Sequence, residues 1–186
     1  NTNYHYIVAE VEDDTDIQLV GEKPWNEYNE AKALGILTKP VIIGPYTLMK
    51  HCRYTGEKKL ADFVDAVVSA YQDFVKKCEE LEIAWVQFDE PALVQDMTAD
   101  DIALFHRLYD ELLPAAKTSK ILLQTYFGDV RNIYPDLIKM DFAGIGLDFI
   151  EGKQTLSLIE TCGFPKKKLL FAGLVNGKNI WKNHYE

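Results

Sequence analysis

Five short apolar runs, each bounded by turn residues, limit most strongly what this chain can fold into. They occupy residues 40–43, 83–88, 121–125, 144–149 and 169–174. Within each run, apolar residues follow one another instead of alternating with polar ones, which is typical of strands covered on both faces. The pattern therefore predicts the strands of a parallel sheet that lies between other layers.

The segments between these runs indicate helices. In residues 60–81 apolar side chains recur every three to four positions, and Thr98 with Asp101 forms a capping-box-like start for a second helix, which Pro114 limits. Residues 25–34 predict another helix, and residues 133–140 and 154–162 each have room for about two helical turns. Strands that alternate with helices predict parallel pairing through right-handed crossovers.

The number of strand–helix units predicts an incomplete barrel. A closed (β/α)8 barrel takes about 250 residues, whereas this chain has 186. We therefore predict an α/β fold, a partial TIM (β/α)8 barrel of about five parallel βα units in a single domain over residues 1–186. Residues 1–25 are expected to form an extended arm or hairpin, and residues 26–186 the βα units.

The two ends of the chain look like cuts in a longer protein. The sequence opens without Met, and its last residues have the polar and aromatic character of a helix that is only beginning. Because an incomplete barrel exposes strand edges and apolar faces, we expect the piece to dimerise or to cover its edges in another way.

Composition and charge argue against several classes of protein. A net charge of -9 and a pI near 5.0 disfavour a nucleic-acid partner, and the lysines at 166–168 are expected to form a solvated turn. The 3 cysteines contain no C-x-x-C pair, so neither a disulfide framework nor a zinc knot is predicted, and Cys78 is expected to be a buried thiol. Without a run of about 18 apolar residues or a leader, we expect no membrane partner and a cytoplasmic protein.

Polar side chains gather where the predicted strands end, which is where parallel α/β barrels carry their functional groups. Asp89 and Glu90 follow the second run and face opposite sides unless the chain turns at Pro91. An ammonium-binding or general-base role and a structural role, in which a carboxylate accepts backbone N–H groups and ties loop to helix, are equally open. Other residues expected at this rim are Tyr46, Thr47, Thr125, Tyr126, Asp148 and Asn176.

Metal and nucleotide motifs are missing from the sequence. The 4 histidines are scattered, without H-x-H, H-x-C or H-E-x-x-H spacing. The segment around Gly144 and Gly146 lacks the rest of a dinucleotide fingerprint. Two functions thus stay open from the residues: a metal-free lyase or hydrolase, if Asp89 and Asp148 converge within about 5 to 9 Å, and a non-catalytic scaffold module.

Several ordered blocks resemble cobalamin-independent methionine synthase. They are Asn-Tyr-His-Tyr at 3–6, Lys-Pro-Val-Ile-Ile-Gly-Pro at 39–45, Asp-Glu-Pro-Ala-Leu at 89–93, Thr-Tyr-Phe at 125–127 and Ala-Gly-Leu-Val-Asn-Gly-Lys-Asn-Ile-Trp at 172–181. The resemblance implies two related barrels and methyl transfer from 5-methyltetrahydropteroyltri-L-glutamate to L-homocysteine. It further implies that zinc, bound by the C-terminal barrel, keeps the homocysteine sulfur as a thiolate.

The same resemblance implies what this piece lacks and what it keeps. It looks like part of the N-terminal barrel, and Thr125, Tyr126 and Phe127 stand where the C-terminal copy carries His-x-Cys zinc ligands, so no metal and no catalytic residue are expected here. Asp89 would correspond to a homocysteine-binding carboxylate whose role has lapsed. Asn3 and His5 would lie in an arm that reaches the folate, with Ala9 in place of the family's usual proline. The isolated piece is then inactive, and its partners are the missing barrel elements and the C-terminal barrel.

Overall fold

The structure, a computed structural model, describes residues 8–182 and is built on one five-stranded parallel sheet. The strands are β2 (Val41–Ile43), β4 (Trp85–Asp89), β5 (Lys120–Gln124), β6 (Gly144–Asp148) and β7 (Leu169–Gly173), in the order β2-β4-β5-β6-β7. Each of the five predicted apolar runs contains one of these strands or most of it. The predicted α/β class is therefore confirmed.

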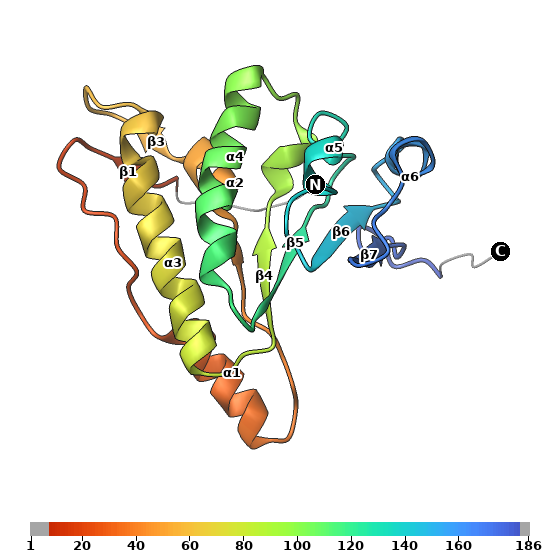
Figure 1. Cartoon of the computed structure of the whole chain (residues 1–186), viewed down its shortest axis with the longest axis horizontal. Helices are drawn as coiled ribbons and strands as arrows, with labels where there is room; N and C mark the ends of the chain where they lie inside the picture. Colours follow the sequence, from red (N-terminus) through yellow and green to blue (C-terminus); the bar gives the residue numbers. More distant parts are fainter. Residues whose placement is uncertain (1–7, 183–186) are drawn as a thin grey trace.

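Helices cover one face of this sheet (Figure 1). The covering helices are α3 (Val64–Glu80), α4 (Ala99–Leu112), α5 (Tyr134–Leu137) and α6 (Thr155–Cys162), while α1 (Lys23–Ala33) lies at the lower end of α3. Phe88 of β4 packs between Tyr71 of α3 and Tyr109 of α4, with ring centroids 5.7 and 6.4 Å away. These buried aromatic rings join the sheet to its helical layer and anchor the core.

The predicted helices form with small differences at their ends. Residues 60–63 are a 3-10 turn, η1 (Leu60–Phe63), that leads into α3, and Thr98 caps α4 through a reciprocal bond with Asp101. The prediction of about two turns for residues 133–140 was wrong, because α5 has only 4 residues. The Asp136 carbonyl accepts from both Lys139 and Met140, so the chain tightens into a turn there.

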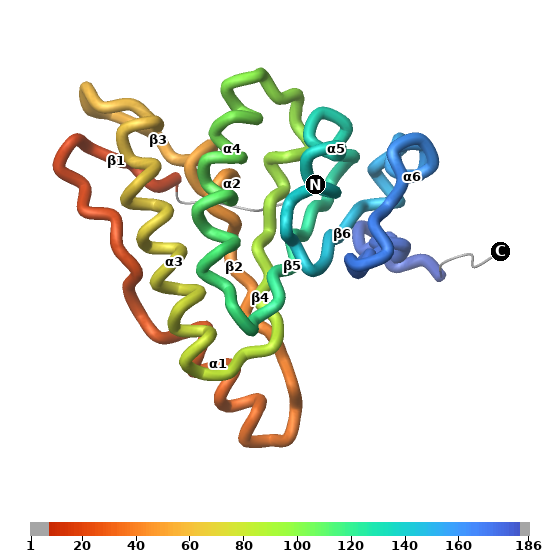
Figure 2. Tube along the Cα trace, viewed as in Figure 1, coloured from red at the N-terminus to blue at the C-terminus, as the bar shows by residue number. Residues whose placement is uncertain are grey.

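Five short elements of residues 8–182 were not predicted: α2 (Pro45–His51), η2 (Pro91–Val94), η3 (Leu113–Ala115) and the two strands of a parallel pair, β1 (Glu10–Val11) and β3 (Arg53–Tyr54). Because β1 pairs in parallel with a distant segment, the described part of the N-terminal region is an extended arm and not a hairpin. Figure 2 shows this arm passing along α3 down to α1.

The face of the sheet away from α3 and α4 is largely open. Val41 and Ile43 of β2 are 49% and 41% exposed, and Leu169 of β7 is 53% exposed. This open face curls, because Trp85 on β4 contacts Phe171 on β7 with ring centroids 5.8 Å apart, although a flat sheet would separate these strands by roughly 14 Å. The curvature and the two unpaired edges are those of a barrel segment, which makes this face the inner surface.

Lys168 corrects the expectation of a solvated lysine turn at 166–168. Lys168 is only 5% exposed, and its Nζ donates to the backbone carbonyls of Met140 and Phe142. Burial lowers the pKa of Lys168. This lysine therefore ties the start of β7 to the loop before β6. Cys78, in contrast, is buried as predicted.

Candidate functional site

The candidate site lies at the carboxyl end of the sheet, where Asp89 ends β4. Asp89 shares its side of the strand with Trp85 and Gln87, which alternate with the fully buried Val86 and Phe88. Its side chain thus belongs to the inner surface. Glu90 lies on the other side, among the helices, and is fully buried. Asp89 and Glu90 therefore point to opposite sides of the sheet, as expected for neighbouring residues of a strand.

Glu90 joins three elements through its carboxylate. The amides of Tyr46 and Thr47 in the first turn of α2 donate to its two oxygens at 3.0 and 2.7 Å. The Tyr109 hydroxyl of α4 donates at 2.6 Å. Gly44 leaves the room for this contact, since a Cβ there would lie 2.2 Å from the carboxyl carbon of Glu90. The geometry is that of the structural alternative, a carboxylate that ties a loop to a helix.

Burial decides the protonation of Glu90. Desolvation raises the pKa of Glu90 from 4.5 to about 7, although the bonds from Thr47, Tyr109 and Tyr46 act in the opposite direction. Near neutral pH the charged and the neutral form of the Glu90 carboxyl are therefore both populated. It is sealed from the open face, so its chemistry is internal to the fold.

Asp89 is held in place by two neutral donors. Gln87 Nε2 donates to one oxygen at 2.7 Å, and the Tyr126 hydroxyl donates to the other at 3.3 Å. Gln87 and Tyr126 orient the carboxylate without neutralising it. The structure thus brings together Asp89 and Tyr126, two of the residues that the sequence placed at this rim.

Asp148 serves the loops that follow β5 and β6. One oxygen accepts the amides of Ile150 and Glu151 at 2.7 and 3.0 Å, and the other accepts the amide of Phe127 at 2.9 Å. Both oxygens are therefore engaged by backbone donors. This arrangement is unlike a general acid or base that awaits a substrate, and it weighs against a lyase or hydrolase that uses Asp89 with Asp148.

The segment that would correspond to zinc ligands does not fit a metal. The Thr125 hydroxyl donates to the Gly146 carbonyl at 2.8 Å and is buried, and Phe127 has no ligand atom. Phe127 also has a φ of 74°, a strained backbone for a residue other than glycine, and the residue is 61% exposed. Among residues 8–182 there is no group of three or more His, Cys, Asp or Glu residues placed to hold a metal ion.

The other expected rim residues are scattered. Tyr46 and Thr47 are buried in the helical layer, and the Thr47 hydroxyl accepts the amide of Ala92 at 3.1 Å. Asn176 accepts the amide of Lys178 at 2.9 Å and so shapes the loop after β7. Asn3 and His5 lie outside the described residues.

Sequence reasoning missed the part that Gln87 and Tyr109 have in this site. Gln87 could have been found, since a polar residue two positions before Asp89 shares its face of the strand. Tyr109 belongs to the apolar stripe of a helix, and the spacing of that stripe does not indicate that its hydroxyl donates to Glu90.

The comparisons with known proteins define the class of this chain. Its sequence matches the family described as cobalamin-independent synthase, N-terminal domain, over residues 1–186. The chain therefore belongs to the cobalamin-independent methionine synthase family. Within residues 8–182, no helix has the length and apolar character needed to cross a membrane.

Particular relatives carry a more specific name. The chain is 52% identical over 186 residues to a 5-methyltetrahydropteroyltriglutamate–homocysteine methyltransferase of Streptococcus thermophilus, covering 100% of this chain and 25% of the relative. It is equally 52% identical to the protein of that name from Lactococcus lactis subsp. lactis, covering 24% of it. The chain thus spans about a quarter of the length of these relatives.

A solved structure supports the fold. The B12-independent methionine synthase from Shewanella sp. W3-18-1, in complex with selenomethionine, aligns with a TM-score of 0.63 at 17% identity, over 81% of this chain and 48% of that chain. At this identity the likeness concerns the fold alone. It confirms the assignment of the sheet as part of a barrel.

Proposed function

We propose that this chain is part of the N-terminal barrel of a methyltransferase that transfers a methyl group from 5-methyltetrahydropteroyltri-L-glutamate to L-homocysteine and forms L-methionine. The observation that carries the proposal is the family match over the entire chain, together with relatives of that name at 52% identity. The protein would act in the cytoplasm, without a nucleic-acid or membrane partner.

The chemistry would belong to the rest of the protein. Zinc in the C-terminal barrel would hold the homocysteine sulfur as a thiolate, the nucleophilic form. In this chain the Thr125 hydroxyl is committed to Gly146 and Asp148 to backbone amides, so neither group is free to take part in methyl transfer. The piece would therefore be inactive alone, and Asn3 and His5 would contribute to folate binding from the arm.

The open inner surface supports the proposed partners. The exposed apolar residues of β2 and β7 lie at the two edges of the sheet, where the missing barrel strands would pair. Without them, the isolated chain would bury these edges against a second copy. Size-exclusion chromatography with light scattering should then give a dimer at high concentration, and a monomer at every concentration would contradict this part of the proposal.

The central experiment compares the isolated chain with a full-length protein that contains it. Both are analysed for zinc by mass spectrometry, titrated calorimetrically with 5-methyltetrahydropteroyltri-L-glutamate and homocysteine, and assayed for methionine. We expect zinc and methionine formation from the full-length protein alone. Stoichiometric zinc in the isolated chain, or a full-length protein that forms no methionine, would overturn the proposal.

A further inference from the structure

The N-terminal arm, residues 8–22, is attached to the domain at a few points. The amide of Arg53 donates to the Ala9 carbonyl at 2.8 Å, and the amide of Thr55 donates to the Val11 carbonyl at 3.0 Å. Val11 is the one buried apolar residue among residues 8–22, at 6% exposed. A parallel pair of two residues on each side is a weak ladder, so the arm needs another attachment to stay in place.

Asp13 provides that attachment. Its carboxylate accepts the amide of Glu57 at 3.1 Å and the amide of Lys58 at 2.8 Å, and the Lys58 Nζ donates to the Asp13 carbonyl at 2.5 Å. These two amides lower the pKa of Asp13, so it is ionised at neutral pH. The turn closes tightly around it, since a Cβ on Gly56 would lie 2.1 Å from its Oδ1.

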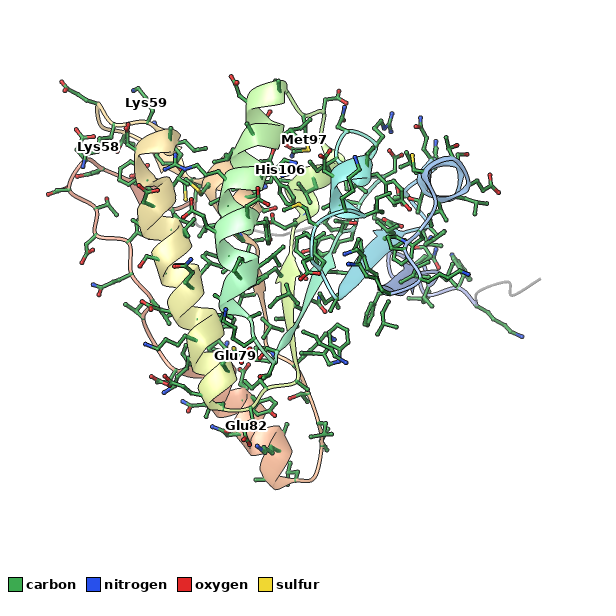
Figure 3. All side chains as sticks on the ribbon, in the orientation of Figure 1. Lys58, Lys59, Glu79, Glu82, Met97 and His106 are labelled. Carbon is green, nitrogen blue, oxygen red and sulfur yellow. The ribbon has the colours of Figure 1, made fainter. Side chains whose placement is uncertain are left out.

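The position of this contact is set by the direction of α3. Helix α3 runs from the carboxyl end of the sheet back to the start of β4, so β3 and the turn at 55–59 lie at the same end as the candidate site. Figure 3 shows Lys58 and Lys59 at that end of α3 and Glu79 at the other. The first described residues of the arm therefore lie at the end of the domain that holds the carboxyl ends of the strands.

We infer that Asp13 is a positioning residue, which latches the N-terminal arm to the turn at 55–59 and so fixes where the arm's first described residues, 8–11, lie at the carboxyl end of the sheet. The inference rests on the proposed function only in its consequence, that the segment with Asn3 and His5 is presented to the folate from a fixed origin. The latch itself rests on the contacts of Asp13 and on the short ladder of β1 and β3.

Hydrogen exchange on the isolated chain tests the latch. Asp13→Ala should raise the exchange rates of the Glu57 and Lys58 amides, and also those of Arg53 and Thr55, by about tenfold. Asp14→Ala, a change at the exposed neighbouring carboxylate, is the matched control and should leave all four rates unchanged. Unchanged rates at Arg53 and Thr55 in Asp13→Ala would show that Asp13 only orders its own turn, and this would overturn the inference.

Two further measurements make the outcome unambiguous. Slow exchange at Phe88 and Leu123, in the core of the sheet, reports that the variant is folded. Asp13→Asn keeps one acceptor oxygen and should give rates between those of wild type and Asp13→Ala.

Steady-state kinetics on a full-length methyltransferase that contains this chain test the consequence. Asp13→Ala should raise the KM for the folate substrate by about tenfold and change the KM for homocysteine by less than about twofold. An unchanged folate KM in a variant whose arm exchanges faster would overturn the positioning role. A wild-type full-length protein without methyl transfer would instead overturn the proposed function and leave the exchange result in place.

Discussion

Replacing Glu90 by Gln should remove a pH dependence of stability that one buried carboxyl produces. Burial raises the pKa of Glu90 from 4.5 to about 7 in the folded chain. A folded pKa above the unfolded one means that the folded state binds the proton more tightly. The stability contribution is then complete below about pH 4.5 and is lost as the pH rises through 7.

The size of the effect follows from the two pKa values. With one pKa unit equal to about 1.4 kcal/mol, the contribution of Glu90 should fall by about 2.5 kcal/mol between pH 5 and pH 8. Gln cannot ionise, so the stability of wild type minus that of Glu90→Gln should decrease by this amount over the same interval. The sign holds whatever constant cost the amide adds by facing the Tyr46 and Thr47 amides.

The assay is urea unfolding followed by tryptophan fluorescence, at several pH values and one protein concentration. Glu79→Gln is the matched control, because the pKa of Glu79 is lowered to about 2 and its contribution stays constant from pH 5 to pH 8. A difference between wild type and Glu90→Gln that is flat, or that grows with pH, would refute the reasoning. The hydrogen bonds to Glu90 would then outweigh its burial.

Three more substitutions test individual contacts of the fold. Burial raises the pKa of Glu79, but hydrogen bonds from the loop before β5 outweigh it and lower this pKa to about 2. Glu79→Gln should therefore reduce the free energy of unfolding by about 2 kcal/mol after solvent screening. That cost should vanish as the pH falls from about 4.5 towards 2; Glu80→Gln, at the exposed neighbour, is the control, and an equal cost there would contradict the assignment. Lys168→Met should cost about 1 to 3 kcal/mol in urea unfolding, because two buried carbonyls lose their donor, and unchanged stability would show that water replaces it. Gly44→Ala should cost about 1 to 3 kcal/mol through overlap with Glu90, and a thermal midpoint equal to wild type would show that the carboxylate moves aside freely.

The strands and long helices could be predicted because each has a local signal. Continuous apolar runs mark buried parallel strands, and the stripe from Leu60 to Cys78 marks α3. Helix α2 carries no such signal: it has 7 residues, and its start depends on the distant Glu90. The pairing of β1 with β3 likewise depends on contacts between segments more than 40 residues apart in the chain, which no local pattern encodes.

The candidate site could be predicted only as a set of residues. Asp89 and Tyr126 meet because parallel strands end at the same edge, and this follows from the sequence. The way each loop bends after its strand decides the rest. This bend directs Asp148 to backbone amides and buries Tyr46 and Thr47 in the helical layer. The burial of Lys168 was missed for the same reason, since its partners are two carbonyls of a separate loop.

The strand order of the main sheet has a consequence for how such a protein is made. In β2-β4-β5-β6-β7 each strand after β2 pairs with the strand of this sheet that was synthesised before it. Once β2 and β4 have paired, a chain leaving the ribosome can therefore add each further strand and its helix to a layer that already exists. Two pairings impose a wait: β1 with β3 and β2 with β4 both join segments more than forty residues apart, so β1 and β2 stay unpaired until that much more chain has been translated.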